Sequence, residues 1–279
     1  MELRLPRKDV LGINARNIEL IYPLNPRQYF SLVDDKLKTK ELLSRHGVPI
    51  PKVLAEAGNL AEIDRALKAV EAAPNLVIKP ASGRAGLGIL ALERASENRW
   101  VDTDGVAWDP WALRIHISNI LMGVYSLEHL QDRAFIEEKV FNPDLINRWV
   151  PCGVPDIRII TLKGNPIMAM LRLPTVKSHG KANLHQGAVG AGVLLQEGKT
   201  HHAILGNETI LVHPDTKIPL VGLEIPRWKE VLDAARAAAA VIPMGYLGVD
   251  IVIDARRGPL VLELNARPGL QIQLANRMG

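Results

Sequence analysis

The sequence predicts an α+β protein in which antiparallel hairpins pack with a few amphipathic helices. Two observations support this prediction. Pairs of short apolar runs flank tight turns, as DIRIITL and PIMAMLRL do on either side of Lys163-Gly164-Asn165. Helical patterns occur between such pairs, but strand and helix do not alternate regularly, as they would in a parallel sheet.

The composition is that of an ordinary globular chain. Hydrophobic residues make up 47% of the 279 residues and charged residues 23%, which is enough apolar material for a sizeable core. A single cysteine excludes an intrachain disulfide. The sequence shows no secretory signal and no uninterrupted apolar span, so we expect a cytoplasmic protein without direct membrane insertion.

The charge balance is basic, with a formal net charge of +4. Such a balance fits nucleic acid, a membrane surface, or a pocket for phosphates and carboxylates. Aromatic residues make up only 4% of the chain, which argues against binding nucleic acid by base stacking. We therefore expect no nucleic-acid partner; a strong fall of affinity with salt would favour that alternative.

The first half of the chain contains two predicted helices. Lys36–Arg45 places three leucines on one side and is followed by Gly47, a typical residue after a helix end. Asn59 is a predicted N-cap for a helix from Leu60 to about Ala72. The stretch up to Phe30 is rich in Pro and Asn, which predicts irregular chain, and residues 99–131 show no definite pattern.

Predicted strands occupy much of the remainder. LVIKP and GILAL form a hairpin around the loop ASGRAGL, and FIEEKV is a further strand. A helix is expected from Arg227 to Ile242, ended by Pro243. The last two strands are LGVDIVID and GPLVLELN, joined by Ala255-Arg256-Arg257-Gly258.

The closing hairpin carries three oxygen-bearing side chains on otherwise apolar strands. Glu263 and Asn265 are two residues apart and so share a face, and the paired strand can bring Asp250 beside them. Converging polar groups among apolar strands are costly unless a cation binds there. Magnesium prefers such oxygen ligands together with phosphate oxygens, so we expect a magnesium site.

The glycine-rich hairpin is the second candidate. Lys79 ends an apolar strand and is followed by Ser82, Gly83, Gly86 and Gly88, whose backbone N–H groups can approach an anion closely. The spacing matches neither G-x-x-x-x-G-K-[ST] nor G-x-G-x-x-G. Lys36, at the start of a helix, would by itself be interpreted as a solvated surface residue.

Taken together, these features resemble the ATP-grasp superfamily, and within it the RimK-type α-L-glutamate ligases. The matching segments follow the family's order from about Asp34 to Ile272: DDKLKTKELLSRHGVPIPKV, LVIKPASGRAGLGI, FIEEKV, DIRIITLKGNPIMAMLR, KANLHQGAVGAG and LGVDIVIDARRGPLVLELNARPGL. The combination is specific, although no single segment is.

The resemblance implies an ATP-grasp fold with two α+β lobes clasping ATP and a truncated N-terminal region. Residues 1–33 would form a short N-terminal segment. Residues 34–135 would form the first lobe, with the glycine-rich flap and a Trp-containing insertion, and residues 136–279 the lobe with the metal site. Where the family carries Arg-Ser-Asn, this chain has Lys181-Ala182-Asn183, and Arg267 replaces a common serine.

The resemblance also implies a role for each matching residue. The expected nucleotide-binding residues are Lys36, Lys79, Ser82, Gly83, Gly86, Gly88, Glu138, Lys139, Val140, Asp156, Lys181 and Asn183. The expected catalytic residues are Arg158, Arg172, Asn265 and Arg267, and the expected ligands of two Mg²⁺ ions, for which Mn²⁺ could substitute, are Asp250, Glu263 and Asn265. His185 is interpreted as a substrate-binding residue rather than a general base.

The activity implied is ATP-dependent C–N bond formation through an acyl phosphate, adding an amino acid such as glutamate to an amine. The carboxylate donor could be an amino acid or another acid, and the acceptor could be a small molecule, a peptide or a protein. A homo-oligomer remains open. The alternatives are an ATP-grasp kinase, a ligase for a non-amino-acid carboxylate, and a nucleotide-sensing regulator without turnover.

Overall fold

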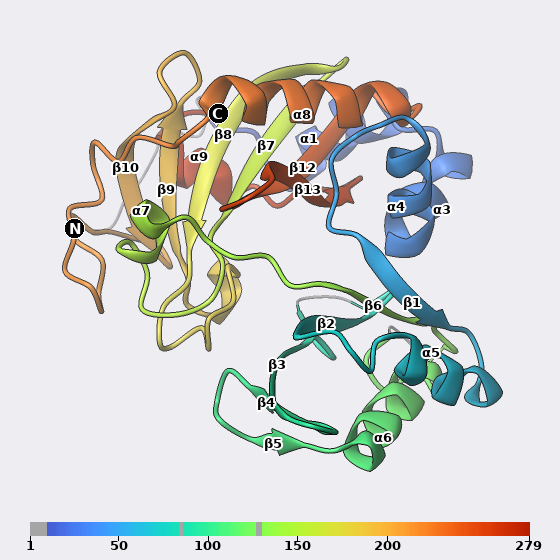
Figure 1. Ribbon diagram of the computed structural model, residues 1–279. Coiled ribbons are helices and arrows are strands. Elements are labelled where there is room, and N and C mark those ends of the chain that lie inside the picture. Colours follow the sequence, from blue (N-terminus) through green and yellow to red (C-terminus); the bar gives the residue numbers. More distant parts are fainter. Residues whose placement is uncertain (1–9, 84–85, 127–129) are drawn as a thin grey trace. The chain divides into compact units, whose positions relative to one another are not determined.

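The structure, a computed structural model, describes residues 10–83, 86–126 and 130–279. The chain divides into two compact units (Figure 1). The first unit comprises Met1–Asp34, Lys38–Ile50 and Val140–Gly279, and the second comprises Asp35–Leu37 and Pro51–Lys139. Each unit contains one antiparallel sheet, so the predicted α+β class is confirmed.

The first unit is built on a seven-stranded sheet in the order β11-β10-β9-β8-β7-β12-β13. Its strands are β7 (Asp156–Leu162), β8 (Asn165–Leu173), β9 (Val189–Leu194), β10 (Lys199–Leu205), β11 (Glu208–Thr209), β12 (Tyr246–Asp254) and β13 (Gly258–Asn265). The predicted hairpins β7–β8 and β12–β13 are both present.

The β7–β8 hairpin shows how local sequence sets the register. Leu162 pairs directly with Asn165, so the loop consists of Lys163 and Gly164 alone. Both loop residues have positive φ, 48° and 81°, as a two-residue hairpin turn of the I′ kind requires. This turn sets the first pairs of the hairpin, and a bulge at Ile167 then shifts the register so that Ile160 lies opposite Met168.

Two helices cover opposite faces of this sheet (Figure 1). α8 (Trp228–Val241) packs on β7, β8, β12 and β13 through a buried, alanine-rich stripe. α9 (Gln271–Asn276) packs on β8, β9 and β10. It approaches β9 so closely that a Cβ on Gly192 would overlap the carbonyl oxygen of Ala275.

Residues 13–24 and 27–29 are helical, so the expectation of irregular chain up to Phe30 was wrong for them; its first nine residues lie outside the described residues. Asn25 explains the difference, because its side chain acts in tertiary rather than local contacts. Its amide donates to the carbonyls of Tyr246 and Ala266, at 2.7 and 3.0 Å, and accepts the Tyr246 N–H at 3.0 Å. Residues 13–24 form one uninterrupted helical stretch with a π-helical segment in its middle, and Pro23 lies in its last turn.

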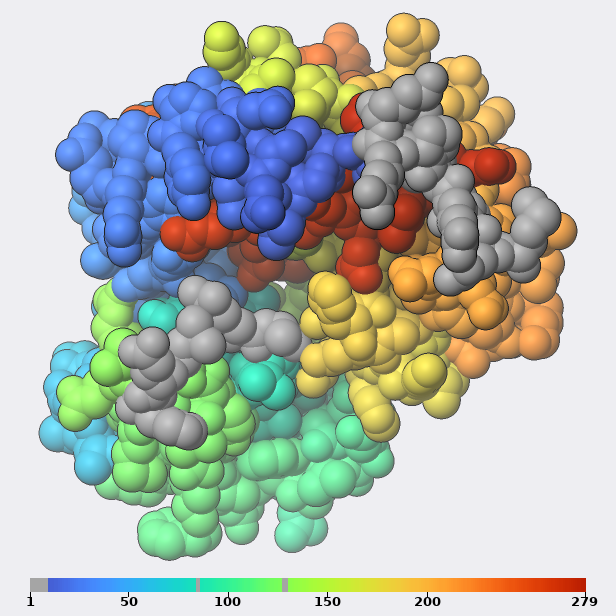
Figure 2. All heavy atoms as spheres, turned by 180° about the vertical axis from the view of Figure 1, so that it is seen from behind, coloured from blue at the N-terminus to red at the C-terminus, as the bar shows by residue number. Residues whose placement is uncertain are grey.

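These short N-terminal helices lie against the C-terminal part of the chain (Figure 2). They are α1 (Ile13–Arg16), the π-helix η2 (Asn17–Ile21), α2 (Tyr22–Leu24), the 3₁₀ turn η3 (Arg27–Tyr29), α3 (Ser31–Asp34) and α4 (Lys36–Arg45). The bounds of α4 match the prediction. Two further short elements of the first unit are α7 (Asp144–Asn147) and η6 (Leu184–Gln186).

The second unit has a six-stranded sheet in the order β1-β6-β2-β3-β4-β5, with two helices and a 3₁₀ turn. The elements are β1 (Val53–Ala57), η4 (Leu60–Glu62), α5 (Ile63–Ala69), β2 (Asn75–Pro80), β3 (Leu90–Ser96), β4 (Arg99–Asp102), β5 (Ala107–Trp108), α6 (Pro110–Leu121) and β6 (Ala134–Glu138). The predicted glycine-rich hairpin is β2–β3, with the predicted strand β6 on its other side.

Two stretches of the second unit differ from or go beyond the prediction. The helix capped by Asn59 begins as η4, and its α-helical part ends at Ala69 rather than about Ala72. The stretch without a definite pattern forms β4, β5 and α6, and Asp109 caps α6 by accepting the N–H of Ala112. Within the described residues, no helix is both long and apolar enough to cross a membrane.

We expect Gly192→Ala to destabilise the first unit by about 1–3 kcal/mol, the usual cost of inserting a methyl group into a packed site. The added Cβ would displace α9 from β9. Urea unfolding would measure the change. Gly12→Ala is the control, because nothing lies within 4 Å of its added Cβ; equal stability of the two variants would contradict the packing described.

Candidate functional site

One face of the seven-stranded sheet is polar at its centre. Ile157 and Ile159 of β7 and Val249 and Ile251 of β12 belong to the main core on the opposite face. Successive side chains of a strand alternate between faces, so Arg158 and Asp250 must project from the other side. The apolar positions of these strands therefore determine where the polar ones lie.

The strand register brings these polar residues into neighbouring pairs. Asp250 lies directly opposite Arg158 of β7 and opposite Glu263 of β13. Asp156, two residues before Arg158, lies opposite Arg172 of β8. Directly paired residues point to the same face, so all five side chains form one patch.

A β-bulge in β13 is needed to place Glu263 in this patch. Asp250 pairs with Glu263 but Ile251 pairs with Val261, so Leu262 is an extra residue. Val261 and Leu264 therefore both reach the core, although three positions separate them. Without the bulge, Glu263 would share the apolar face with Val261.

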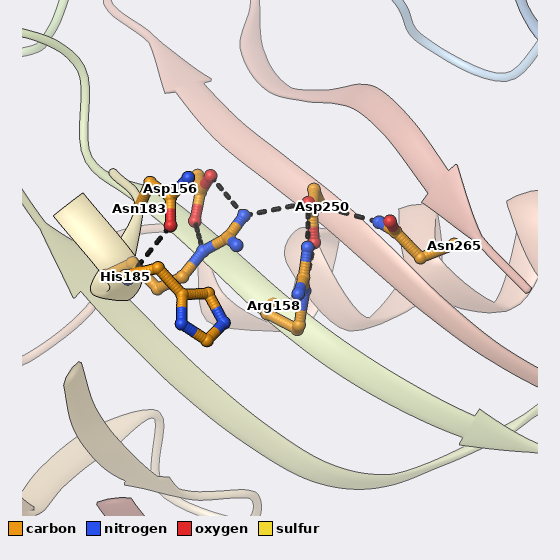
Figure 3. Close-up of polar contacts among 7 residues, drawn as sticks. Asp156, Arg158, Asn183, His185, Asp250 and Asn265 are labelled. Carbon is orange, nitrogen blue, oxygen red and sulfur yellow. Dashed lines mark hydrogen bonds and ion pairs between the residues drawn. The ribbon is translucent and has the colours of Figure 1, made fainter. Parts of the chain in front are cut away.

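The carboxylate of Asp250 is the centre of the patch (Figure 3). Arg158 contacts both of its oxygens, with Nε 2.7 Å from Oδ1 and Nη2 2.5 Å from Oδ2. Arg172 Nη2 donates to the same Oδ2 at 2.7 Å. The Asn265 amide approaches Oδ2 at 3.3 Å. Asp250 is 1% exposed, so the two guanidinium groups compensate a fully buried negative charge.

Arg172 also pairs with Asp156 through two hydrogen bonds, which links the four charged residues into one chain. The order is Asp156, Arg172, Asp250 and Arg158. A planar guanidinium can serve two carboxylates at once because it presents donors along more than one edge. The site therefore contains a preformed network rather than isolated side chains.

Burial and charge move the pKa values of the two aspartates in opposite directions. Burial raises the pKa of Asp156 to about 6, more than the neighbouring Arg172 lowers it, and the charge of Asp250 raises it further. Burial also acts to raise the pKa of Asp250, but Arg158 and Arg172 outweigh it and hold that pKa below its usual range. Asp250 is therefore ionised at neutral pH.

The predicted ligands Asp250, Glu263 and Asn265 carry oxygen donors of the kind that suit a divalent cation, and in this structure both oxygens of Asp250 are bonded by Arg158. Asp156, Asp250 and Glu263 supply three carboxylates against two guanidinium groups, which leaves one negative charge in excess when all are ionised. Carboxylate and amide oxygens are the ligands that Mg²⁺ prefers. No three His, Cys, Asp or Glu side chains gather as a metal site in the described residues, so the predicted set needs Asn265 as its third donor.

The loop between β8 and β9 carries three further predicted residues. The Asn183 side chain caps η6 by accepting the His185 N–H at 3.0 Å (Figure 3). His185 is exposed and Lys181 is half-buried. The buried residues Thr175 and Ser178 anchor the start of this loop. The backbone N–H of each donates a hydrogen bond to the side-chain hydroxyl of the other.

Arg267 follows Asn265 but takes a different contact. Its guanidinium lies over the ring of Phe30, 4.2 Å from the ring centroid. Arg267 is exposed, whereas Phe30 is 9% exposed. Stacking on Phe30 fixes the orientation of the Arg267 guanidinium without requiring a carboxylate partner. Because only the face of the guanidinium is used, its N–H donors stay available for a ligand.

The second unit holds the other predicted set. Lys36 Nζ donates to the Gly83 carbonyl at 2.6 Å, so one predicted phosphate lysine touches the glycine-rich loop. Lys79 is paired with Glu137, whose side chain is buried. Lys139 pairs with Glu93 at 2.6 Å. Arg84 and Ala85 of the predicted flap lie outside the described residues.

The predicted adenine-binding residues lie where β6 ends. The Glu138 N–H donates to the Lys52 carbonyl at 3.0 Å and is therefore already used within the second unit. Val140, 8% exposed, packs with Val252 and Leu260 in the first unit. Adenine binding by the backbone of Glu138, Lys139 and Val140 stays a prediction.

Sequence reasoning missed two acidic residues of the second unit. Glu137 pairs with Lys79, and Asp132 accepts the N–H of Ser82 with both oxygens at 3.0 Å. A signal for Glu137 was available, because a glutamate in the middle of the apolar run FIEE is costly unless it is paired. Asp132 lies between the stretch without a definite pattern and the predicted strand FIEEKV, where no pattern singled it out.

Comparison with known families gives a match over most of the chain. The model of the sugar-transfer associated ATP-grasp family matches residues 15–279. Curated relatives include the probable alpha-L-glutamate ligase of Halorhodospira halophila, 27% identical over 259 residues, covering 92% of this chain and 63% of the relative. That of Pseudomonas putida is 24% identical over 253 residues, covering 90% of this chain and 61% of the relative. The chain thus spans about three fifths of these relatives' length.

Solved structures share the fold at low sequence identity. The ATP-grasp ligase PsnB complexed with its minimal precursor has a TM-score of 0.51 and 16% identity, covering 92% of this chain and 59% of that chain. PsnB complexed with a phosphomimetic variant of the precursor, Mg and ADP has a TM-score of 0.50 and 16% identity, covering 92% of this chain and 57% of that chain. The predicted ATP-grasp resemblance is confirmed at the level of fold and family.

The raised pKa of Asp156 predicts a titration near pH 6 in the nucleotide-free protein. Asp250→Asn removes a negative charge and frees Arg172 to serve Asp156 alone, so the midpoint should fall toward the ordinary aspartate value. Carboxyl-carbon NMR would measure it.

Asp233→Asn, on the exposed face of α8, is the matched control and should leave the Asp156 midpoint unchanged. The sign follows from linkage: an acid whose pKa is raised by folding adds stability as pH falls from about 6 to 4. An unchanged midpoint in Asp250→Asn would refute the electrostatic coupling.

Proposed function

The chain belongs to the sugar-transfer associated ATP-grasp family, and we propose that it is an ATP- and Mg²⁺-dependent carboxylate–amine ligase. The observation that supports this most directly is the buried network around Asp250, with Glu263 opposite and Asn265 beside it. Two buried carboxylates, Asp156 and Asp250, held by two arginines beside a half-buried glutamate are expensive to keep in a sheet unless they serve a cationic or transferring group.

Each residue of the patch has a role in the proposal. Asp250, Glu263 and Asn265 hold Mg²⁺, which when bound neutralises charge on the phosphate oxygens of ATP. Arg158 and Arg172 bind oxygens of the phosphoryl group or of the substrate carboxylate, for which their planar donors are suited. Asp156 keeps Arg172 in place. Arg267 contributes a further cationic group beside Asn265.

The second unit supplies groups for the nucleotide. We assign Lys36 and Lys79 to the phosphates, together with backbone N–H groups of Ser82, Gly83, Gly86 and Gly88. Lys79 is held by Glu137 and would have to share its charge with a phosphate. Glu138, Lys139 and Val140 are proposed to bind adenine through backbone atoms, and Lys181 and Asn183 to contact the nucleotide.

The proposed reaction has two steps. A carboxylate oxygen attacks the γ-phosphorus of ATP, the bond to the β,γ-bridging oxygen breaks, and an acyl phosphate and ADP form. An amine then attacks the acyl carbon, phosphate leaves, and the amine loses one proton to give an amide. Negative charge develops on transferring oxygens in both steps, so positioned guanidinium donors contribute more than a general base would.

The names of the relatives support a proposal for the substrate class. The curated relatives are named probable alpha-L-glutamate ligases, and the solved structure with a TM-score of 0.51 is of an ATP-grasp ligase complexed with its minimal precursor. We propose that one substrate is an amino acid such as glutamate and that the other is an amine acceptor, with a peptide as the first candidate. An acidic donor would suit the arginines of the patch.

Glu263→Gln should reduce Mg²⁺-dependent ADP release at least a hundredfold, because it removes a proposed metal-binding carboxylate while preserving side-chain shape. ADP release would be measured across a panel of amino acids and peptides, followed by mass measurement of the product. A gain of one glutamate residue on the acceptor would identify the donor.

Glu208→Gln is the matched control, because Glu208 is an exposed residue of β11, and it should retain full activity. Turnover of Glu263→Gln at the wild-type rate would refute the metal assignment. A phosphorylated product without an amide would instead identify a kinase, and the absence of ADP release with every acceptor would refute the ligase.

A further inference from the structure

The stretch from Trp100 to Asp132 contacts both ends of the glycine-rich loop. We propose that His116 and Tyr125 are positioning residues for ATP, which fix the C-terminal end of this loop and thereby set the affinity for the nucleotide. This inference rests on the proposed function, because it takes the loop to bind phosphates. The contacts that support the inference are those of Ser82, Gly83 and Gly88, which the structure describes on either side of residues 84–85.

The C-terminal end of the loop is fixed at Gly88. Its φ of +72° is a conformation that favours glycine, and a Cβ built there would lie 2.6 Å from Cδ2 of Tyr125. The Tyr125 ring therefore packs directly against the backbone. The Gly88 carbonyl accepts a hydrogen bond from His116 Nε2 at 3.0 Å. Gly88 is therefore held both by packing against Tyr125 and by a hydrogen bond from His116.

His116 is itself held in a defined orientation. It is 9% exposed on α6 and lies between two aromatic rings, with centroid distances of 5.7 Å to Trp108 and 5.6 Å to Tyr125. Trp108 is in turn fixed by its Nε1, which donates to Asp102 Oδ2 at 2.9 Å. Burial lowers the pKa of His116, so its neutral ring donates from Nε2.

The N-terminal end of the loop is fixed by different contacts. Asp132, 7% exposed, accepts the Ser82 N–H with both carboxylate oxygens at 3.0 Å. Lys36 Nζ donates to the Gly83 carbonyl. The loop is therefore anchored at both ends. His116 and Tyr125 come from the stretch whose pattern predicted no definite structure, and Asp132 directly follows that stretch.

Anchoring of this kind acts on binding through pre-organisation. Backbone N–H groups bind an anion well only when several point at it together, and ordering them on binding reduces affinity. Gly86, Leu87 and Gly88 follow each other in a turn whose last residue His116 and Tyr125 hold. Loss of these contacts should therefore raise the KM for ATP and leave the chemistry of the first unit unchanged.

His116→Leu should raise the KM for ATP about tenfold, the effect of losing one hydrogen bond of ordinary strength, while kcat and the KM for the amino acid stay within about twofold. His116→Gln should restore most of the loss, because its amide can donate to the same carbonyl. Rescue by a donor of different shape separates positioning from a merely structural role.

Tyr125→Ala is the second test and should raise the KM for ATP in the same way. Tyr125→Phe is its matched control, because the contacts with Gly88 come from the ring and Cβ rather than from the hydroxyl. This pair keeps the inference testable if His116→Leu fails to fold.

Hydrogen exchange of the full-length protein without nucleotide provides a readout independent of activity. Amides of residues 86–92 should exchange faster in His116→Leu and Tyr125→Ala than in the wild type, while those of β12 and β13 do not change. Unchanged exchange in both variants, or faster exchange with an unchanged KM for ATP, would overturn the inference. A wild type that neither binds nor turns over ATP would fail at the proposed function, irrespective of the exchange result.

Discussion

The first unit depends on one constraint: the buried charge of Asp250 must be compensated within the sheet. Arg158 lies directly opposite on β7 and Arg172 reaches the same carboxylate from β8. Removing either partner of such a buried pair typically costs about 3–5 kcal/mol, whereas replacing the whole set with apolar residues is often harmless. The presence of the full network in this chain is therefore better explained by a binding role than by stability.

The two units contribute different kinds of groups to the proposed site: charged side chains in the first and backbone N–H groups in the second. In the first unit, charged residues project from the centre of a sheet whose opposite face is packed under α8, which makes the patch rigid. In the second unit, the groups assigned to phosphate are mainly backbone atoms of a glycine-rich loop, whose two described ends are held by Asp132, His116 and Tyr125. Rigid charges suit the reacting oxygens, and backbone N–H groups suit the phosphates.

Sequence patterns predicted the elements whose signals are local. The Lys163-Gly164 turn, the α4 helix and the strands bearing Asp250 and Glu263 all follow from periodicity and turn chemistry. The N-terminal helices were missed because Asn25 acts through distant carbonyls, which a local interpretation takes as a loop signal. The pairing of Lys79 with Glu137 and of Gly88 with His116 depends on which strands and helices become neighbours, and spacing alone does not contain that information.

The two-residue turn between β7 and β8 limits how this protein can vary. The pairing already absorbs one extra residue, Ile167, in a bulge next to this turn. Strand side chains alternate with a period of two, so a further inserted residue that no bulge absorbed would reverse the orientation of β8 beyond it. Arg172 would then enter the apolar core, and Leu171 would take its place among the carboxylates. Surface loops usually tolerate changes in length. We expect the length of the Lys163-Gly164 turn to be constrained as strongly as the charged residues that it helps to place.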